Sequence, residues 1–95
     1  MTVTVKVLGP LIKIAGASTF TLEVTPGTTV RELLNQVFDI YGEDMEANVM
    51  NESRTDLAPY YKILINGRNS KLMQYLETEL EEGQVVFIMP PVAGG

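Results

Sequence analysis

The C-terminal end of the chain combines residue types that suit a reaction at the main-chain carboxylate. The final residues are Met89-Pro90-Pro91-Val92-Ala93-Gly94-Gly95. Two prolines favour an extended, polyproline-like exit from the residues before them. The last two residues have no Cβ, so another protein can approach their backbone closely. Gly95 is therefore the candidate reactive residue, and the segment that an enzyme would thread into its active site is Gly94, Ala93, Val92, Pro91 and Pro90.

The chemistry open to a terminal carboxylate is activation by a nucleotide. With a pKa of about 3.5 the group is ionised at neutral pH and is a weak electrophile. Attack of a carboxylate oxygen on the α-phosphate of ATP would form a mixed anhydride. A sulfur or amine nucleophile could then displace AMP and give a thiocarboxylate or an amide. The alternative is a frayed terminus with no role.

The composition removes most other chemistry from the chain. It has 95 residues, no cysteine and no histidine. One small domain is therefore expected, without thiolate sites and without the commonest general base. The acidic residues of the 77–82 segment surround an expected turn and are interpreted as a solvated edge. We expect no catalytic residue, no metal site and no bound cofactor.

Charge and hydropathy limit the partners. The chain has 12 acidic and 7 basic residues and a net charge of −5, which disfavours nucleic acid and favours a basic protein surface. The apolar stretches are too short for a membrane span or a signal peptide. We therefore expect a cytoplasmic protein with protein partners, and neither nucleic acid nor membrane among them.

Alternating patterns predict the strands that hold the C-terminal segment. Polar and apolar residues alternate over 2–8 and over 20–24, so these two segments are expected to pair as a hairpin. A third strand over 61–65 leads into Asn66-Gly67, a tight-turn signal. Residues 85–89 are apolar on both faces, which is typical of a central strand or of one whose outer face meets a partner.

One main helix is expected between the second and third strands. Thr29 and Glu32 have the spacing of a capping box, in which each side chain satisfies a free N–H group of the other residue. An apolar stripe follows at helical spacing, and Gly42 is a plausible end. The predicted class is α+β, a mixed sheet with one main helix packed across it.

Three other segments have weaker patterns. Residues 11–17 are mixed and contain glycine, residues 43–60 favour a helical turn or two and then a loop, and residues 70–82 favour a short helical or 3-10 segment. No linker interrupts the chain. We expect one domain over residues 1–89 and a flexible tail over residues 90–95.

The last strand also predicts a docking surface. Alternation places Phe87 and Met89 on one face, opposite to their neighbours in the chain, so they are expected to face outward beside the tail. With Pro91 they would form an apolar docking patch. Leu64 and Met73 are expected to extend it.

Four sequence features occur together across nearly the whole chain. They are the opening Val-rich strand, Pro26-Gly27-Thr28-Thr29-Val30 before the helix with Leu33-Leu34 inside it, the turn Ile65-Asn66-Gly67, and the ending Leu80, Gly83 and Pro90-Pro91-Val92-Ala93-Gly94-Gly95. With these features the chain resembles the MoaD/ThiS sulfur carriers of the ubiquitin-like β-grasp superfamily. The ending is most similar to the MoaD branch, the small subunit of molybdopterin synthase.

The resemblance implies a fold and a reaction cycle. The fold is β-grasp, and an E1-like (MoeB-like) enzyme would use ATP to adenylate Gly95, which a sulfur donor would convert to a thiocarboxylate. The tail would then dock into the large (MoaE-like) subunit of molybdopterin synthase and deliver sulfur for the dithiolene of molybdopterin or tungstopterin. The carrier itself would contribute no catalytic residue.

Other functions fit the same features. Archaeal small protein modifiers resemble MoaD and are joined through the diglycine, here Gly95, to lysines of target proteins, and ThiS-like carriers serve thiamine biosynthesis. A passive β-grasp interaction module is a further alternative. The chain departs from the family pattern in residues 42–60, which are longer and more acidic than in ThiS-like proteins, and in Glu82-Gly83-Gln84, which replaces the common Gly-Asp-Glu.

Overall fold

The fold was obtained as a computed structural model of the chain, in which residues 1–91 are described. The elements in chain order are β1 (Thr2–Val7), α1 (Pro10–Ala15), β2 (Thr19–Glu23), α2 (Val30–Tyr41), α3 (Glu43–Val49), β3 (Lys62–Ile65), β4 (Arg68–Asn69), the 3-10 turns η1 (Ser70–Leu72) and η2 (Tyr75–Glu77), and β5 (Val85–Met89).

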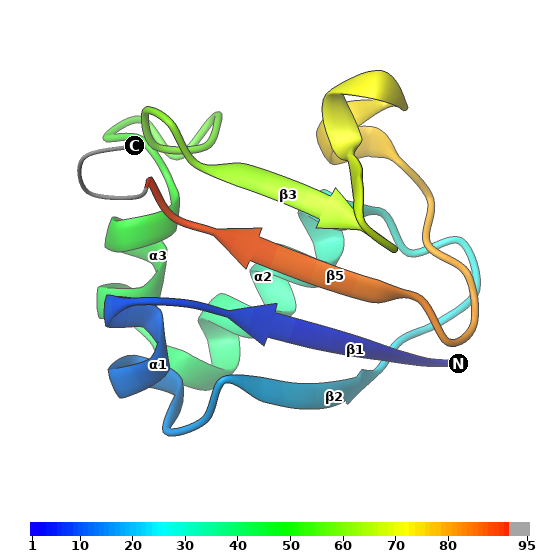
Figure 1. Cartoon of the computed structure of the whole chain (residues 1–95), viewed down its shortest axis with the longest axis horizontal. Coiled ribbons are helices and arrows are strands. Elements are labelled where there is room, and N and C mark those ends of the chain that lie inside the picture. Colours follow the sequence, from blue (N-terminus) through cyan, green and yellow to red (C-terminus); the bar gives the residue numbers. More distant parts are fainter. Residues whose placement is uncertain (92–95) are drawn as a thin grey trace.

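The strands form one mixed sheet in the order β2-β1-β5-β3-β4 (Figure 1). β1 pairs antiparallel with β2 and parallel with β5, while β3 pairs antiparallel with both β5 and β4. β5 therefore lies in the middle of the sheet, as its apolar sequence predicts. The antiparallel pairing of the first two strands is also confirmed.

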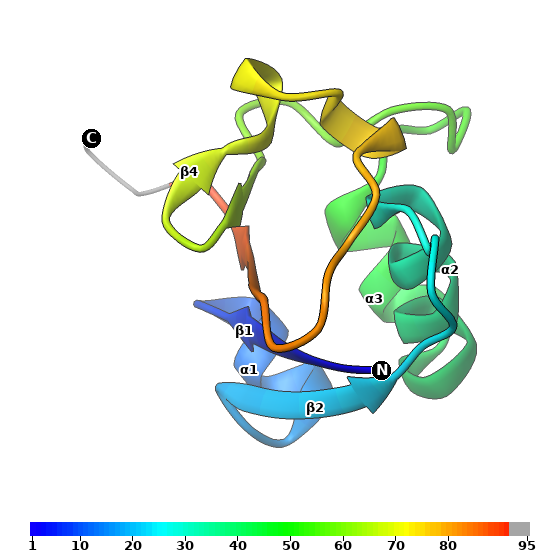
Figure 2. The same ribbon diagram turned by 90° about the vertical axis from the view of Figure 1, so that its right-hand side faces the viewer.

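The helices α2 and α3 lie on the same side of this sheet (Figure 2). The core fills the space between them and the strands. Val5 of β1, Val86 and Ile88 of β5, and Leu33 and Val37 of α2 are fully buried there. The mixed sheet with its longest helix packed across one face is the α+β arrangement that the patterns predict and the β-grasp fold that the resemblance implies.

The start of α2 has the predicted capping box. Oγ1 of Thr29 accepts a hydrogen bond from the N–H of Glu32 at 3.2 Å, and Oε1 of Glu32 accepts one from the N–H of Thr29 at 2.9 Å. The helix ends at Tyr41, before Gly42, whose φ of +87° favours glycine. Both ends of the main helix are therefore predicted correctly.

The predicted turn after β3 also forms hydrogen bonds to β5. Asn66 and Gly67 have φ values of +50° and +81°, as a tight hairpin turn requires. The N–H of Asn66 donates to the carbonyl of Val85 at 2.8 Å, and Oδ1 of Asn66 accepts from the N–H of Val85 at 2.7 Å. The asparagine therefore both makes the turn and fixes the start of β5.

One short helix was not expected, and a second confirms the helical turns predicted within residues 43–60. The connection between β1 and β2 contains α1, where the sequence predicts only a mixed, Gly-containing stretch. Pro10 starts this helix, and Leu11 is its single fully buried residue. In α3, acidic residues in the first turn favour the helix, and Met45 and Val49 bury its inner side. The two 3-10 turns agree with the prediction for 70–82.

In the part of the chain described, no helix is long and apolar enough to cross a membrane.

Candidate functional site

The C-terminal segment leaves the sheet from its middle strand. β5 ends at Met89, which pairs with Lys62 of β3, and Pro90 has no N–H group with which to continue the ladder. Gly9, in the turn after β1, lies next to Pro90. A Cβ placed on Gly9 would be 3.7 Å from Cγ of Pro90. The φ of +59° at Gly9 favours glycine in this turn. The segment therefore begins beside the turn that precedes α1.

The structure places two of the five residues predicted to be threaded into an active site. Pro90 is half-buried and Pro91 is exposed. Val92, Ala93, Gly94 and Gly95 lie outside the described residues, so the reactive role of Gly95 and the threading role of the others stay predictions.

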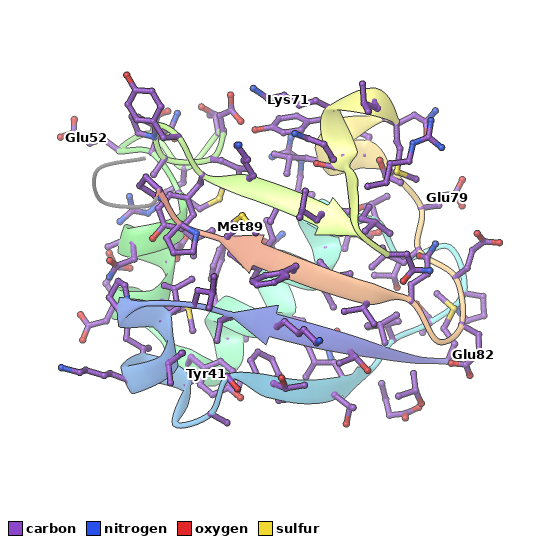
Figure 3. The ribbon with its side chains drawn as sticks, in the orientation of Figure 1. Tyr41, Glu52, Lys71, Glu79, Glu82 and Met89 are labelled. Carbon is purple, nitrogen blue, oxygen red and sulfur yellow. The ribbon has the colours of Figure 1, made fainter. Side chains whose placement is uncertain are left out.

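The predicted alternation of β5 is confirmed. Val86 and Ile88 are fully buried, whereas Phe87 and Met89 are half-buried on the face opposite to α2. Phe87 pairs with Leu64 of β3 on one side, so the structure brings these two residues of the predicted patch together. Met89 lies at the end of β5 from which the tail leaves (Figure 3).

Met73, the remaining predicted docking residue, lies elsewhere. It follows η1, outside the strands whose register carries Phe87, and it packs half-buried against the core. A sequence pattern alone could not place it, because it lies between the 3-10 turns η1 and η2, which have no alternating face. Of the predicted docking residues, the structure therefore brings together Phe87, Met89 and Leu64.

Two further exposed hydrophobic residues, which were not selected from the sequence, stand close in the chain to the strands on either side of β5. Leu8 follows β1 directly and is 38% exposed, on the same side of the alternation as Lys6. Tyr60 is 84% exposed and has a φ of +67°, two residues before the strand that pairs with Met89. The parity of β1 was a usable signal for Leu8. Nothing in the sequence marks Tyr60, because its exposure depends on the path of the preceding loop.

A polar hollow of about 370 Å³ adjoins β3. It is lined in part by Lys62, Lys71, Asp56 and Tyr75. The hydroxyl of Tyr75 donates to Oδ1 of Asp56 at 2.6 Å, and this bond, with one from the N–H of Leu57, holds the pKa of Asp56 below its ordinary value. Burial and the bond to Asp56 raise the pKa of Tyr75 to about 12. The pair fixes the loop before β3 to η2.

The side chains that the structure places near the end of β5 include the apolar residues Phe87, Met89 and Leu64. The described side chains include no group of three or more histidine, cysteine, aspartate or glutamate residues placed to hold a metal ion. The half-buried apolar side chains beside Pro90 form a surface that another protein can contact.

Comparison with known proteins identifies the family. The ThiS family matches residues 5–95 of the chain. A candidate sulfur carrier protein of Archaeoglobus fulgidus is 39% identical over 67 residues, which are 70% of this chain and 74% of that protein.

Solved structures share the fold. The solution structure of small archaeal modifier protein 1 (SAMP1) from Methanosarcina acetivorans superposes with a TM-score of 0.83 at 29% identity, over 99% of this chain and 96% of that one. A candidate molybdopterin converting factor subunit 1 from Pyrococcus furiosus gives a TM-score of 0.74 at 26% identity, over 97% and 99%. The family match spans nearly the whole sequence, and the solved structures reproduce the sheet and its main helix. The chain therefore belongs to the ThiS family, within the group of ubiquitin-like β-grasp proteins that includes the MoaD-type sulfur carriers.

Proposed function

We propose that this chain carries sulfur as a thiocarboxylate on Gly95 and donates it in molybdopterin or tungstopterin biosynthesis, as the small subunit of a molybdopterin synthase. The relative named as a candidate sulfur carrier supports the first part of the proposal. The likeness to the molybdopterin converting factor subunit from Pyrococcus furiosus supports the second part.

The observation that carries the proposal is the course of the last strand. β5 is paired on both sides, and the chain runs from its end through Pro90-Pro91 to Gly94-Gly95. A central strand is held by two ladders, so the tail begins from a fixed point of the fold. The body then acts as a handle for the partner while the narrow diglycine end reaches an active site elsewhere.

The reaction needs no side chain of this protein. A carboxylate oxygen of Gly95 attacks the α-phosphorus of ATP on the partner enzyme, pyrophosphate leaves, and the glycyl carbonyl becomes a mixed anhydride with AMP. A sulfur donor delivers sulfur at the sulfide level to that carbonyl carbon, and AMP leaves with the C–O bond electrons. The product is a thiocarboxylate, from which the sulfur passes to the pterin precursor.

The face of the sheet opposite to α2, which carries Phe87 and Met89, is called the open face. Beside the tail, this open face provides the contact with both partners of the cycle. The first is an E1-like adenylating enzyme and the second is the large subunit of the synthase. Phe87, Met89 and Leu64 form the centre of the contact, and Leu8 extends it toward the turn before α1. Because ATP is consumed in the cycle, the cytoplasm is the expected compartment.

Conjugation of Gly95 to lysines of other proteins is the second candidate function. The likeness to the modifier from Methanosarcina acetivorans favours it, since that protein matches 99% of this chain. The same adenylate serves both functions, and they differ in the nucleophile: sulfur for the carrier and a lysine amine for the modifier. A carrier for thiamine biosynthesis would share the thiocarboxylate and differ only in its acceptor.

Mass spectrometry of the chain from its own cells separates these functions. For the sulfur carrier we expect intact protein with one oxygen of the C-terminus replaced by sulfur, and purified thiocarboxylate should convert a pterin precursor to molybdopterin when the large subunit is added. A variant without Gly95 is the control and should acquire no sulfur. Gly94-Gly95 remnants on lysines of many proteins, with no thiocarboxylate, would instead establish the modifier.

A further inference from the structure

The charges of this protein are distributed unevenly over its surface. The net charge is −5, and Figure 3 shows one exposed carboxylate, that of Glu52, at the same end of the molecule as Met89. Of the basic residues, Arg31 and Arg54 form ion pairs away from this face: Arg31 Nε lies 2.7 Å from Glu77, and Arg54 Nη2 lies 2.8 Å from Glu43. These arginines are therefore already partnered on the helix-covered side of the molecule.

Two lysines stand on the open face directly beside the apolar patch. Lys6 of β1 is the parallel partner of Phe87, and Lys62 of β3 is the antiparallel partner of Met89. Both are exposed, and neither forms an ion pair with any residue of the 1–91 segment. Their aliphatic stems can lie along the apolar side chains while the ammonium groups remain in water. The patch therefore has a positive charge on each side.

A third lysine continues this cationic border. Lys71 lines the hollow beside β3 together with Lys62, and its Nζ lies 5.9 Å from the centre of the Tyr75 ring. The one carboxylate in the hollow is Asp56, which already accepts hydrogen bonds from the Tyr75 hydroxyl and the Leu57 N–H. Asp56 keeps its negative charge, and Lys71 contributes to lowering its pKa, so Lys6 and Lys62 are the charges beside the patch that have no ion-pair partner among residues 1–91.

The carboxylates of Glu23 and Glu82 lie at the opposite end of the strands. Glu23 of β2 is the register partner of Thr2, and Glu82 accepts a hydrogen bond from the N–H of Thr2 at 2.8 Å. Thr2 and Lys6 are four residues apart on β1, which is about 13 Å along a strand. Figure 3 shows Glu79 and Glu82 at the end of the sheet remote from Met89. The cationic border is therefore confined to the end where the tail begins.

We propose that the open face, in the function proposed above, binds a protein surface whose apolar centre is bordered by carboxylates. Opposite charges around an apolar contact speed association and fix its register, and like charges brought together there cost several kcal/mol. The net charge of −5, taken alone, predicts a basic partner. The lysines beside Phe87 and Met89 require the opposite sign at the contact itself.

Charge reversal on the full-length chain tests this inference. Lys6→Glu and Lys62→Glu are compared with Lys13→Glu, which makes the same change in net charge on the exposed side of α1. The measurement is the association rate and Kd with the E1-like enzyme, together with the melting temperature and the ATP–pyrophosphate exchange rate at saturating carrier. Each reversal on the face should weaken binding about tenfold, mainly through slower association. Lys13→Glu should change binding less than about twofold.

Each outcome bears on one proposal or the other. Tighter binding by Lys6→Glu and Lys62→Glu, or binding equal to that of Lys13→Glu, overturns the acidic border and leaves the carrier function intact if Gly95 is still adenylated. Absence of ATP–pyrophosphate exchange with the unaltered chain contradicts the carrier function, and this inference with it. The neutral variants Lys6→Gln and Lys62→Gln should give intermediate binding. If they match the reversals instead, the lysines act through packing rather than charge.

Discussion

The two faces of β5 have nearly the same apolar composition and different surroundings. Val86 and Ile88 are fully buried beneath the helices, whereas Phe87 and Met89, one residue away, are half-buried on the face that α2 and α3 leave free. A strand buried on one face needs apolar residues at alternate positions only. The second apolar set is therefore not required by the core, and it is the set that lies beside the tail.

Ile88→Ala gives the largest expected loss of stability. Removing a fully buried aliphatic side chain costs its transfer free energy and leaves a cavity, so the free energy of unfolding should fall by about 2–5 kcal/mol. Val85→Ala, on the other face of the same strand, is the control and should cost about 1 kcal/mol or less. Denaturant unfolding measures both. Equal losses would contradict the assignment of the two faces.

Phe87→Ala should separate binding from folding. The half-buried ring lies at the centre of the patch, so its loss should weaken binding to the E1-like enzyme at least about tenfold and cost about 1 kcal/mol of stability. Phe20→Ala is the matched control, because Phe20 is also half-buried but packs on the helix side, with its ring centre 5.0 Å from that of Tyr41. Calorimetry of both variants should show weaker binding for Phe87→Ala alone. Equal binding would mean that the open face is not the contact.

Thr29→Ala tests how far the covered face depends on its main helix. Loss of the hydroxyl that accepts from the N–H of Glu32 should cost about 1 kcal/mol and leave binding to the partner unchanged. Thermal unfolding and a binding titration measure the two effects. Thr29→Ser, which keeps the hydroxyl, should restore most of the stability. A binding defect in the alanine variant at a temperature where it is folded would show that α2 contributes to the contact.

Asp56→Asn gives the smallest and most pH-dependent effect. The folded pKa of Asp56 is lowered from 3.8, mainly by the Tyr75 hydroxyl, so the stabilisation is present above pH 3.8 and is lost as the pH falls through the lower folded value. At pH 7 the variant should be destabilised by about 0.5 kcal/mol, because the Asp56 carboxylate is exposed to solvent. The difference in melting temperature from the unaltered chain should disappear in acid. A constant difference over this range would exclude the carboxylate as its cause.

Much of the fold could be predicted because local signals and tertiary packing agree. The alternation of β1, the Thr29–Glu32 capping box and the Asn66-Gly67 turn each specify a local geometry that the sheet then uses. The helix α1 was missed because it has only six residues and one fully buried side chain, so no periodicity could develop.

The candidate site could be predicted only in part. The parity of Phe87 and Met89 follows from the strand itself. The lysines on either side of them required the strand order, since Lys6 and Lys62 come from segments 56 residues apart that meet only at β5. Charge summed over the whole chain therefore gave no indication of the local sign beside the tail.

The most direct test of the central claim is adenylation of chains that differ only at the terminus. The unaltered chain, a chain ending in a C-terminal amide and a chain with one added tryptophan are each incubated with ATP and the E1-like enzyme, and ATP–pyrophosphate exchange is followed. Exchange is expected only with the free Gly95 carboxylate, while all three chains keep the same melting temperature. Exchange of equal rate with the amide, or with the untrimmed tryptophan chain, would show that Gly95 is not the site of activation.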